Sequence, residues 1–169
     1  MQVLYRTYNM KKILIALNYD PTAEKIAEAG YALATAMKAE VVLLHVIAEP
    51  AYYSSMEDSP IMGFTGFMDF SDVNIPEVVD ELKKESQRFL DQSKEHLGDA
   101  SIKTLVMEGV FADSIVEAAR SESANIIVMG SHGRGGLDKL IMGSVAEKVL
   151  HHSSIPLFII PTREFEKKS

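Results

Sequence analysis

Glycines and a serine at fixed spacing mark the part of the chain that could bind phosphate. They form the pattern Gly130-x2-Gly133-x9-Gly143-Ser144, directly after the apolar run Ile126 to Met129. Such a run is typical of a strand buried on both faces of a parallel sheet, and Ser144 followed by Glu147 predicts a capping box at a helix N-terminus. A strand, a glycine-rich loop and a helix N-terminus together present backbone N–H groups to phosphate. The alternative interpretation is a strand-to-helix turn whose glycines are purely structural.

The spacing separates this loop from two common phosphate-binding loops. A P-loop requires Lys and then Ser or Thr directly after its last glycine, whereas Gly135 is followed by Gly136 and Leu137. The dinucleotide fingerprint G-x-G-x-x-G could begin at Gly133 and Gly135, but Asp138 occupies the position of its third glycine. The sequence therefore predicts neither of these loops.

The same spacing resembles the phosphate-binding signature of the ATP-binding branch of the universal stress protein family. The neighbouring residues Met129-Gly130-Ser131-His132-Gly133 and Gly143-Ser144-Val145 also resemble that family, and the resemblance covers residues 11 to 161. It implies ATP as the ligand, with Mg²⁺ or Mn²⁺ held by the phosphates. It also implies a regulatory role in the stress response.

Strands and helices are expected to alternate along the chain, with no internal repeat. Apolar runs predict strands at Ile13 to Leu17 and Glu40 to Ile47, a partly alternating edge strand at Ser101 to Glu108, and a last strand at Leu157 to Ile160. This alternation predicts an α/β fold: a doubly wound, five-stranded parallel sheet with helices on both faces. The resemblance adds the strand order 3-2-1-4-5, an adenine nucleotide alpha hydrolase-like arrangement. Its first and fourth strands would be neighbours where such sheets bind ligands.

A length of 169 residues predicts one domain. We expect an N-terminal extension at residues 1–9, a single universal stress protein domain at residues 10–163 and a charged tail at residues 164–169. Residues 48–75 mix aromatic residues and methionines with prolines and glycines, which predicts a long loop insertion. We expect this insertion to cover the core or contact a second subunit rather than to serve a dedicated partner.

Composition limits the partners. A net charge of −7 argues against nucleic acid and against an anionic membrane surface, and the absence of cysteine excludes disulfides and thiolate metal sites. The sequence contains neither a signal peptide nor an apolar span of about 18 residues, which predicts a cytoplasmic protein. An apolar last strand, Leu157 to Ile160, would leave an open sheet edge. The resemblance implies that this strand pairs across a two-fold axis to form a homodimer, and any other protein partner is unknown.

The resemblance also assigns residues to each part of an ATP site. The nucleoside would meet the ends of three strands, at Ala16, Leu17, Asn18, Val46, Met129 and Gly130. Among these, the backbone of Val46 would bind the edge of the adenine, since an N–H and a C=O offer one donor and one acceptor. The phosphates would meet the glycine-rich loop and the next helix, at His132, Gly133, Arg134, Gly143, Ser144 and Val145.

Groups that could activate a nucleophile are not evident. Asn18 occupies the position where the family usually has an aspartate, and His132 has no evident carboxylate to orient it. No spaced histidine and carboxylate ligand set appears, and His45, inside the second strand, is expected to be a core histidine. We therefore expect ATP binding without turnover, no catalytic residue and no protein-built metal site. Two alternatives stay open: a slow ATPase or phosphotransferase, and an ATP-free protein-interaction module.

Overall fold

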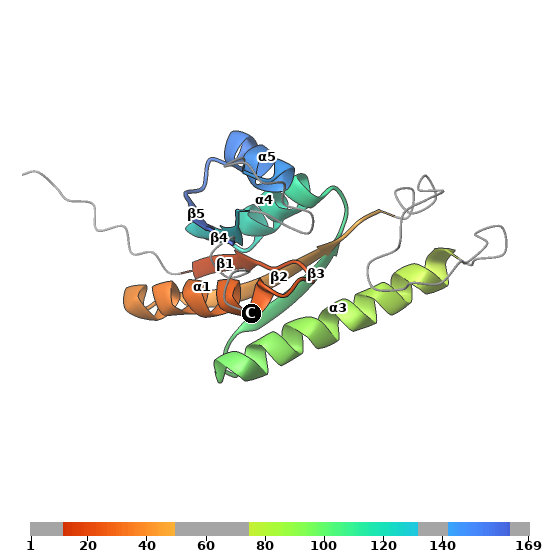
Figure 1. The fold of residues 1–169 in the computed structure, drawn as a ribbon, viewed down its shortest axis with the longest axis horizontal. Helices are drawn as coiled ribbons and strands as arrows, with labels where there is room; N and C mark the ends of the chain where they lie inside the picture. The colour runs from red at the N-terminus through yellow and green to blue at the C-terminus, as the bar shows by residue number, and fades with distance from the viewer. Residues whose placement is uncertain (1–11, 50–74, 132–141, 163–169) are drawn as a thin grey trace, which may run out of the picture.

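The structure is a computed structural model that describes residues 12–49, 75–131 and 142–162 of the chain (Figure 1). Strands and helices follow one another in the predicted order, as β1 (Lys12–Ala16), α1 (Ala23–Met37), β2 (Glu40–Ile47), α3 (Ile75–Leu97), β3 (Lys103–Glu108), α4 (Phe111–Ser121), β4 (Ile126–Gly130), α5 (Ser144–His152) and β5 (Leu157–Ile160). The predicted N-terminal extension, most of the predicted insertion and the charged tail lie outside the described residues.

The five strands form one parallel sheet in the order β3-β2-β1-β4-β5, which confirms the predicted fold class and strand order. β1 and β4 are neighbours, and Ala16 at the end of β1 lies opposite Met129 near the end of β4. From β1 the chain continues to β2 on one side, and from β4 it continues to β5 on the other. The carboxyl ends of β1 and β4 therefore mark the switch point at which sheets of this kind bind ligands.

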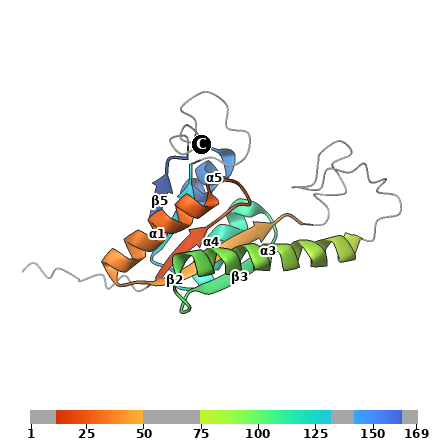
Figure 2. The same cartoon turned by 60° about the horizontal axis from the view of Figure 1, so that its bottom comes forward.

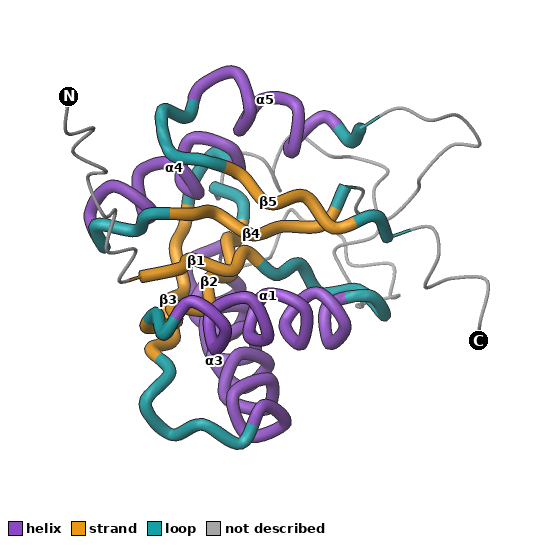
Figure 3. Tube along the Cα trace, turned by 90° about the vertical axis from the view of Figure 1, so that its left-hand side faces the viewer, coloured by secondary structure: helices purple, strands orange, loops and turns teal. Residues whose placement is uncertain are grey.

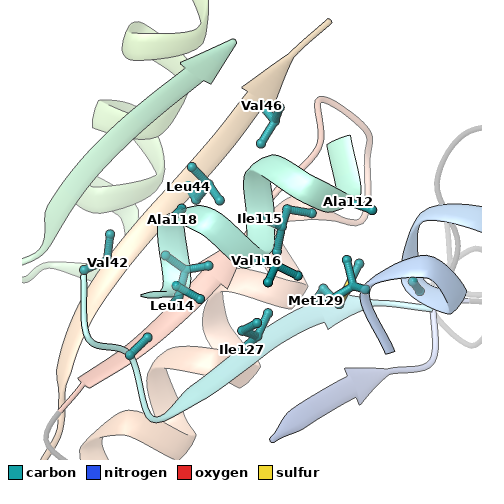
Figure 4. Packing of buried hydrophobic residues seen from close by; sticks show 14 residues of the cluster. Leu14, Val42, Leu44, Val46, Ala112, Ile115, Val116, Ala118, Ile127 and Met129 are labelled. Atoms are coloured by element: carbon teal, nitrogen blue, oxygen red, sulfur yellow. The ribbon is translucent and has the colours of Figure 1, made fainter. Parts of the chain in front are cut away.

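Helices cover both faces of the sheet. α1 and α3 lie on one side of the strands and α4 and α5 on the other (Figure 3), and α1 lies beside α3 (Figure 2). Because successive strand residues point to opposite faces, Leu14 and Ile127 pack beneath α4 and α5 (Figure 4). Ile13 and Val128 pack against the α1 and α3 side. This burial on both faces explains why β1 and β4 are continuous apolar runs in the sequence.

Helix α1 approaches the sheet closely at Gly30. A Cβ at this position would lie 2.7 Å from Cδ1 of Ile15 and 3.2 Å from Cγ1 of Val128, closer than carbon atoms normally pack. Ile15 and Val128 are fully buried, so they have little room to move away. The helix that follows β1 is thus seated directly on the two strands that form the switch point.

The two edges of the sheet differ from its centre. β3 is partly exposed along its length, as its alternating pattern predicted. β5 forms the other edge, where the Phe158 side chain is 44% exposed. No helix within the described ranges is long and apolar enough to cross a membrane.

Candidate functional site

The predicted nucleoside residues gather at the carboxyl ends of the central strands. Ala16 and Met129 are register partners, and Val46 lies in the same buried cluster as Met129, with Ala16 and Val145 packed against it. These residues of β1, β2, β4 and α5 therefore share one hydrophobic cluster, and their contact with a nucleotide stays a prediction. His132, Gly133 and Arg134 lie outside the described residues, so their part in the site remains a prediction.

The backbone N–H and C=O of Val46 point to the β1 side of β2, at a position along the sheet beyond the last residue of β1. Leu44 accepts a hydrogen bond from the Leu17 N–H on the β1 side, with an N···O distance of 2.8 Å. Ile47 accepts one from the Gly109 N–H on the β3 side, at 3.0 Å. Because backbone groups along a strand alternate between its two sides, the N–H and C=O of Val46 point the same way as those of Leu44. The donor and acceptor expected to meet an adenine edge are thus directed beyond the end of β1.

The side-chain amide of Asn18 is oriented by the carboxylate of Asp20, two residues further along the chain. Asn18 Nδ2 donates to Asp20 Oδ2 at 2.6 Å, while Asp20 Oδ1 accepts from the backbone N–H of Thr22 at 2.7 Å and from its hydroxyl. An ionised carboxylate can only accept, so the NH₂ end of the amide must face Asp20. The other end of the Asn18 amide is its carbonyl oxygen, which can accept a hydrogen bond from a ribose hydroxyl.

The N-terminus of α5 is held against the end of β4 by Ser131. The Ser131 N–H donates to the Ile160 carbonyl at 2.8 Å, and the Ser131 carbonyl accepts from the Gly143 N–H at 2.7 Å. Its hydroxyl accepts from the N–H of the buried Thr162 at 3.2 Å. One residue therefore joins β4, the start of α5 and the segment after β5.

Gly143, rather than Ser144, caps helix α5. The carbonyl of Gly143 accepts from the Glu147 N–H at 3.0 Å, and Gly143 has extended dihedral angles of φ −60° and ψ 150°. Ser144 is the first helical residue and no side chain caps the helix, so the predicted capping box is wrong. Because the Gly143 N–H already bonds to Ser131 and the first helical bond is that of Glu147, the N–H groups of Ser144, Val145 and Ala146 have no acceptor within the helix, and the first two belong to the predicted site.

His45 is buried, as the sequence predicted. Its side chain is 4% exposed, and its ring meets that of Phe89 edge-on with centroids 5.6 Å apart. Nδ1 lies 2.7 Å from the Leu17 carbonyl oxygen, which can only accept, so Nδ1 carries a hydrogen. Burial lowers the pKa of the imidazole below its ordinary value, and the hydrogen bond to Leu17 opposes part of that shift.

One group of carboxylates and imidazole in the described ranges has donor atoms close enough to share a cation. Glu24 and Glu28 of α1 and His96 of α3 place one such atom each within 4.8 Å of the others, all on exposed side chains. His96 Nδ1 lies 2.9 Å from Glu24 and Nε2 lies 2.7 Å from Glu28. The hydrogen bond to Glu28 is the main cause of a raised pKa for this imidazole. An imidazolium between two carboxylates accounts for the cluster without a metal.

Comparison with known proteins places the chain in a family. The model of the universal stress protein family matches residues 9–161. Universal stress protein MJ0577 of Methanocaldococcus jannaschii is 31% identical over 162 residues, which cover 95% of this chain and 97% of that protein. Universal stress protein YxiE of Bacillus subtilis is 30% identical over 151 residues, covering 88% of this chain and 97% of that protein.

Solved structures share the fold. The structure of MJ0577 superposes with a TM-score of 0.67 at 29% identity and covers 90% of this chain and 96% of its own. A crystal structure of a universal stress protein in complex with cAMP has a TM-score of 0.58 at 16% identity and covers 90% and 98%. The second likeness concerns the fold alone. Together with the family model, the sequence relatives show that this chain belongs to the universal stress protein family.

Proposed function

We propose that this protein binds ATP at the carboxyl ends of β1 and β4 and acts as a nucleotide-dependent regulator in the stress response. The observation that carries the proposal is the hydrogen bond between Gly143 and Ser131, which holds the start of α5 against the end of β4. A helix N-terminus offers unpaired N–H groups and the positive end of the helix dipole, and both favour phosphate. The glycine spacing that resembles the ATP-binding branch of the family supports the same ligand.

The nucleoside would lie across the ends of β1 and β2. The N–H and C=O of Val46 would pair with the donor and acceptor on the adenine edge. The carbonyl oxygen of Asn18, turned away from Asp20 by the hydrogen bond described above, would accept from a ribose hydroxyl. Ala16, Met129 and Gly130 would form the surface beneath the sugar, since they end the two strands that meet there.

The phosphates would lie at the start of α5. The N–H groups of Ser144 and Val145 and the Ser144 hydroxyl would donate to them, because Gly143 and the helix leave these donors at the N-terminus. His132, Gly133 and Arg134 complete this half of the site in the proposal. Binding must rely on such local donors, since the chain carries a net charge of −7.

We infer binding without rapid turnover. Phosphoryl transfer needs a positioned metal and an oriented nucleophile, and the side chain at the end of β1 is the neutral Asn18. Its carboxylate neighbour, Asp20, is engaged by Asn18 and by the Thr22 backbone and hydroxyl. Single-turnover hydrolysis of labelled ATP with Mg²⁺ and with Mn²⁺ tests this. A rate approaching about 1 per second, ordinary for an enzyme, would contradict it.

We also propose a homodimer that pairs through β5. This strand forms one edge of the sheet, and an exposed apolar edge strand favours pairing with another chain. Phe158 on β5 and Leu150 on α5 are 44% and 51% exposed. A second copy of β5 would cover the edge.

Native mass spectrometry of the purified protein tests the nucleotide proposal. We expect the mass of bound ATP on the protein as isolated or after addition of ATP. cAMP, the ligand of the structurally related complex, serves as a second probe because it lacks the β- and γ-phosphates. The proposal would be contradicted if the protein contains no adenine nucleotide as isolated and binds none when ATP or cAMP is added.

A further inference from the structure

The β1–β2 ladder stops one hydrogen bond earlier than its register allows. In a parallel pair, each residue of the partner strand can bond to two residues of the first strand. Its N–H donates to the carbonyl of one residue, and its carbonyl accepts from the N–H of the residue two positions further on. Leu44 accepts from the Leu17 N–H at 2.8 Å, so the next bond would run from the Val46 N–H to the Leu17 carbonyl. Within the described residues Val46 makes no such bond.

The Leu17 carbonyl instead accepts a hydrogen bond from a side chain, which fixes the direction of this carbonyl. His45 Nδ1 lies 2.7 Å from the Leu17 oxygen. The His45 ring points to the face covered by α1 and α3, where it meets Phe89 edge-on, and Phe89 in turn meets Tyr19 with centroids 5.0 Å apart. The carbonyl that would have extended the ladder thus bonds to an imidazole seated on that face of the sheet.

We propose that His45 is a positioning residue of the nucleotide site: by holding the Leu17 carbonyl, it leaves the Val46 N–H unpaired for a nucleobase. This inference rests on the proposed function and goes beyond it by giving the residue that keeps the adenine-binding donor open. His45 acts through Leu17 and Val46, and no contact between His45 and the ligand is required.

Two substitutions separate the hydrogen bond from the packing of the ring. His45→Asn keeps a donor at the place of Nδ1, because both nitrogens are bonded to Cγ, but removes the ring that meets Phe89. His45→Phe keeps an aromatic ring and removes the donor. A positioning role through the hydrogen bond predicts that Asn preserves ATP binding and Phe does not, whereas a packing role predicts the reverse.

The ligand-free protein provides the first test. We expect the Val46 amide of the wild type and of His45→Asn to exchange with solvent much faster than the neighbouring ladder amides, as followed by NMR hydrogen exchange. In His45→Phe the Leu17 carbonyl is released and can accept from Val46, so this amide should become protected. Equal protection of the Val46 amide in wild type and His45→Phe would overturn the proposal.

ATP affinity provides the second test. Calorimetric titration of ATP should give the same Kd for wild type and His45→Asn within about threefold. The Kd of His45→Phe should be roughly tenfold larger, because the Val46 N–H then bonds to Leu17 and one hydrogen bond to the ligand is lost. Unchanged affinity in His45→Phe, or a Kd for His45→Asn as weak as that of His45→Phe, would overturn the role of His45 alone. A wild type that binds no ATP would overturn the proposed function, and the role of His45 with it.

Discussion

Replacing Asn18 by aspartate would restore the residue type usual in the family, yet in this chain we expect it to destabilise the protein. The Asn18 amide donates to Asp20 at 2.6 Å, so Asn18→Asp would face one carboxylate with another. Two like charges about 4 Å apart repel by roughly 1 kcal/mol in water and roughly 4 kcal/mol near a protein surface. Both residues are partly exposed, which favours the lower part of this range.

The lost hydrogen bond adds about 1 kcal/mol. We therefore expect Asn18→Asp to lower the free energy of unfolding by about 2 kcal/mol at pH 7, or the midpoint of thermal unfolding by roughly 5 °C for a chain of this size. Urea unfolding measures the free energy, and Asn18→Ala is the control that loses the hydrogen bond without adding charge.

A double substitution makes this prediction sharper. Asn18→Asp combined with Asp20→Asn reverses the pair, so that residue 20 donates to residue 18 and still accepts from Thr22 through its carbonyl oxygen. We expect the double variant to recover most of the lost stability. A single variant as stable as the wild type at pH 7, or a double variant no more stable than the single one, would refute the assignment of Asp20 as the group that orients Asn18.

Three further outcomes are expected from other parts of the molecule. Gly30→Ala should lower the free energy of unfolding in urea by about 1 kcal/mol, because its Cβ would lie 2.7 Å from buried Ile15; an unchanged midpoint would contradict this. The pKa of His96 is raised, first by the hydrogen bond to Glu28, so its ion pairs stabilise the fold below the ordinary histidine pKa and this contribution is lost as pH rises through the raised pKa. The difference in unfolding free energy between wild type and His96→Gln should therefore fall from pH 5.5 to pH 9, roughly spanning the pKa of histidine. A difference that stays constant over this range would be inconsistent with the ion pairs. Ile159→Lys should weaken the proposed dimer in light scattering at micromolar concentration, whereas a monomeric wild type would rule the dimer out.

The fold could be predicted because the local signals agree with one another. Uninterrupted apolar runs indicate strands buried on both faces, as the neighbouring residues Ile127 and Val128 of β4 show by packing on opposite faces, and their alternation with amphipathic segments allows few topologies. The order of the strands came from the family resemblance rather than from periodicity, and the structure confirms it. The domain boundaries lie where no described residue tests them and remain predictions.

The site was only partly predictable, because its decisive hydrogen bonds join residues far apart in the sequence. His45 and Leu17 are 28 positions apart, and no local pattern shows which carbonyl a core histidine reaches. The pattern of Ser144 and Glu147 fits a helix whose cap is Ser144, but Gly143 takes the extended conformation of a cap and moves the helix start by one residue. The bond from Gly143 to Ser131 likewise depends on how β4 and α5 meet in space.

If the start of α5 binds the phosphates of ATP, a larger side chain at Gly143 should weaken binding, which calorimetric titration of ATP into Gly143→Val measures. Gly143 has dihedral angles that valine adopts without strain, so the variant should fold. Ser154→Val adds the same side chain at an exposed position beyond the other end of α5 and is the matched control. We expect wild type and Ser154→Val to bind ATP equally and Gly143→Val to bind at least about tenfold more weakly, a loss of about 1.4 kcal/mol or more. Equal affinity in all three proteins would contradict it.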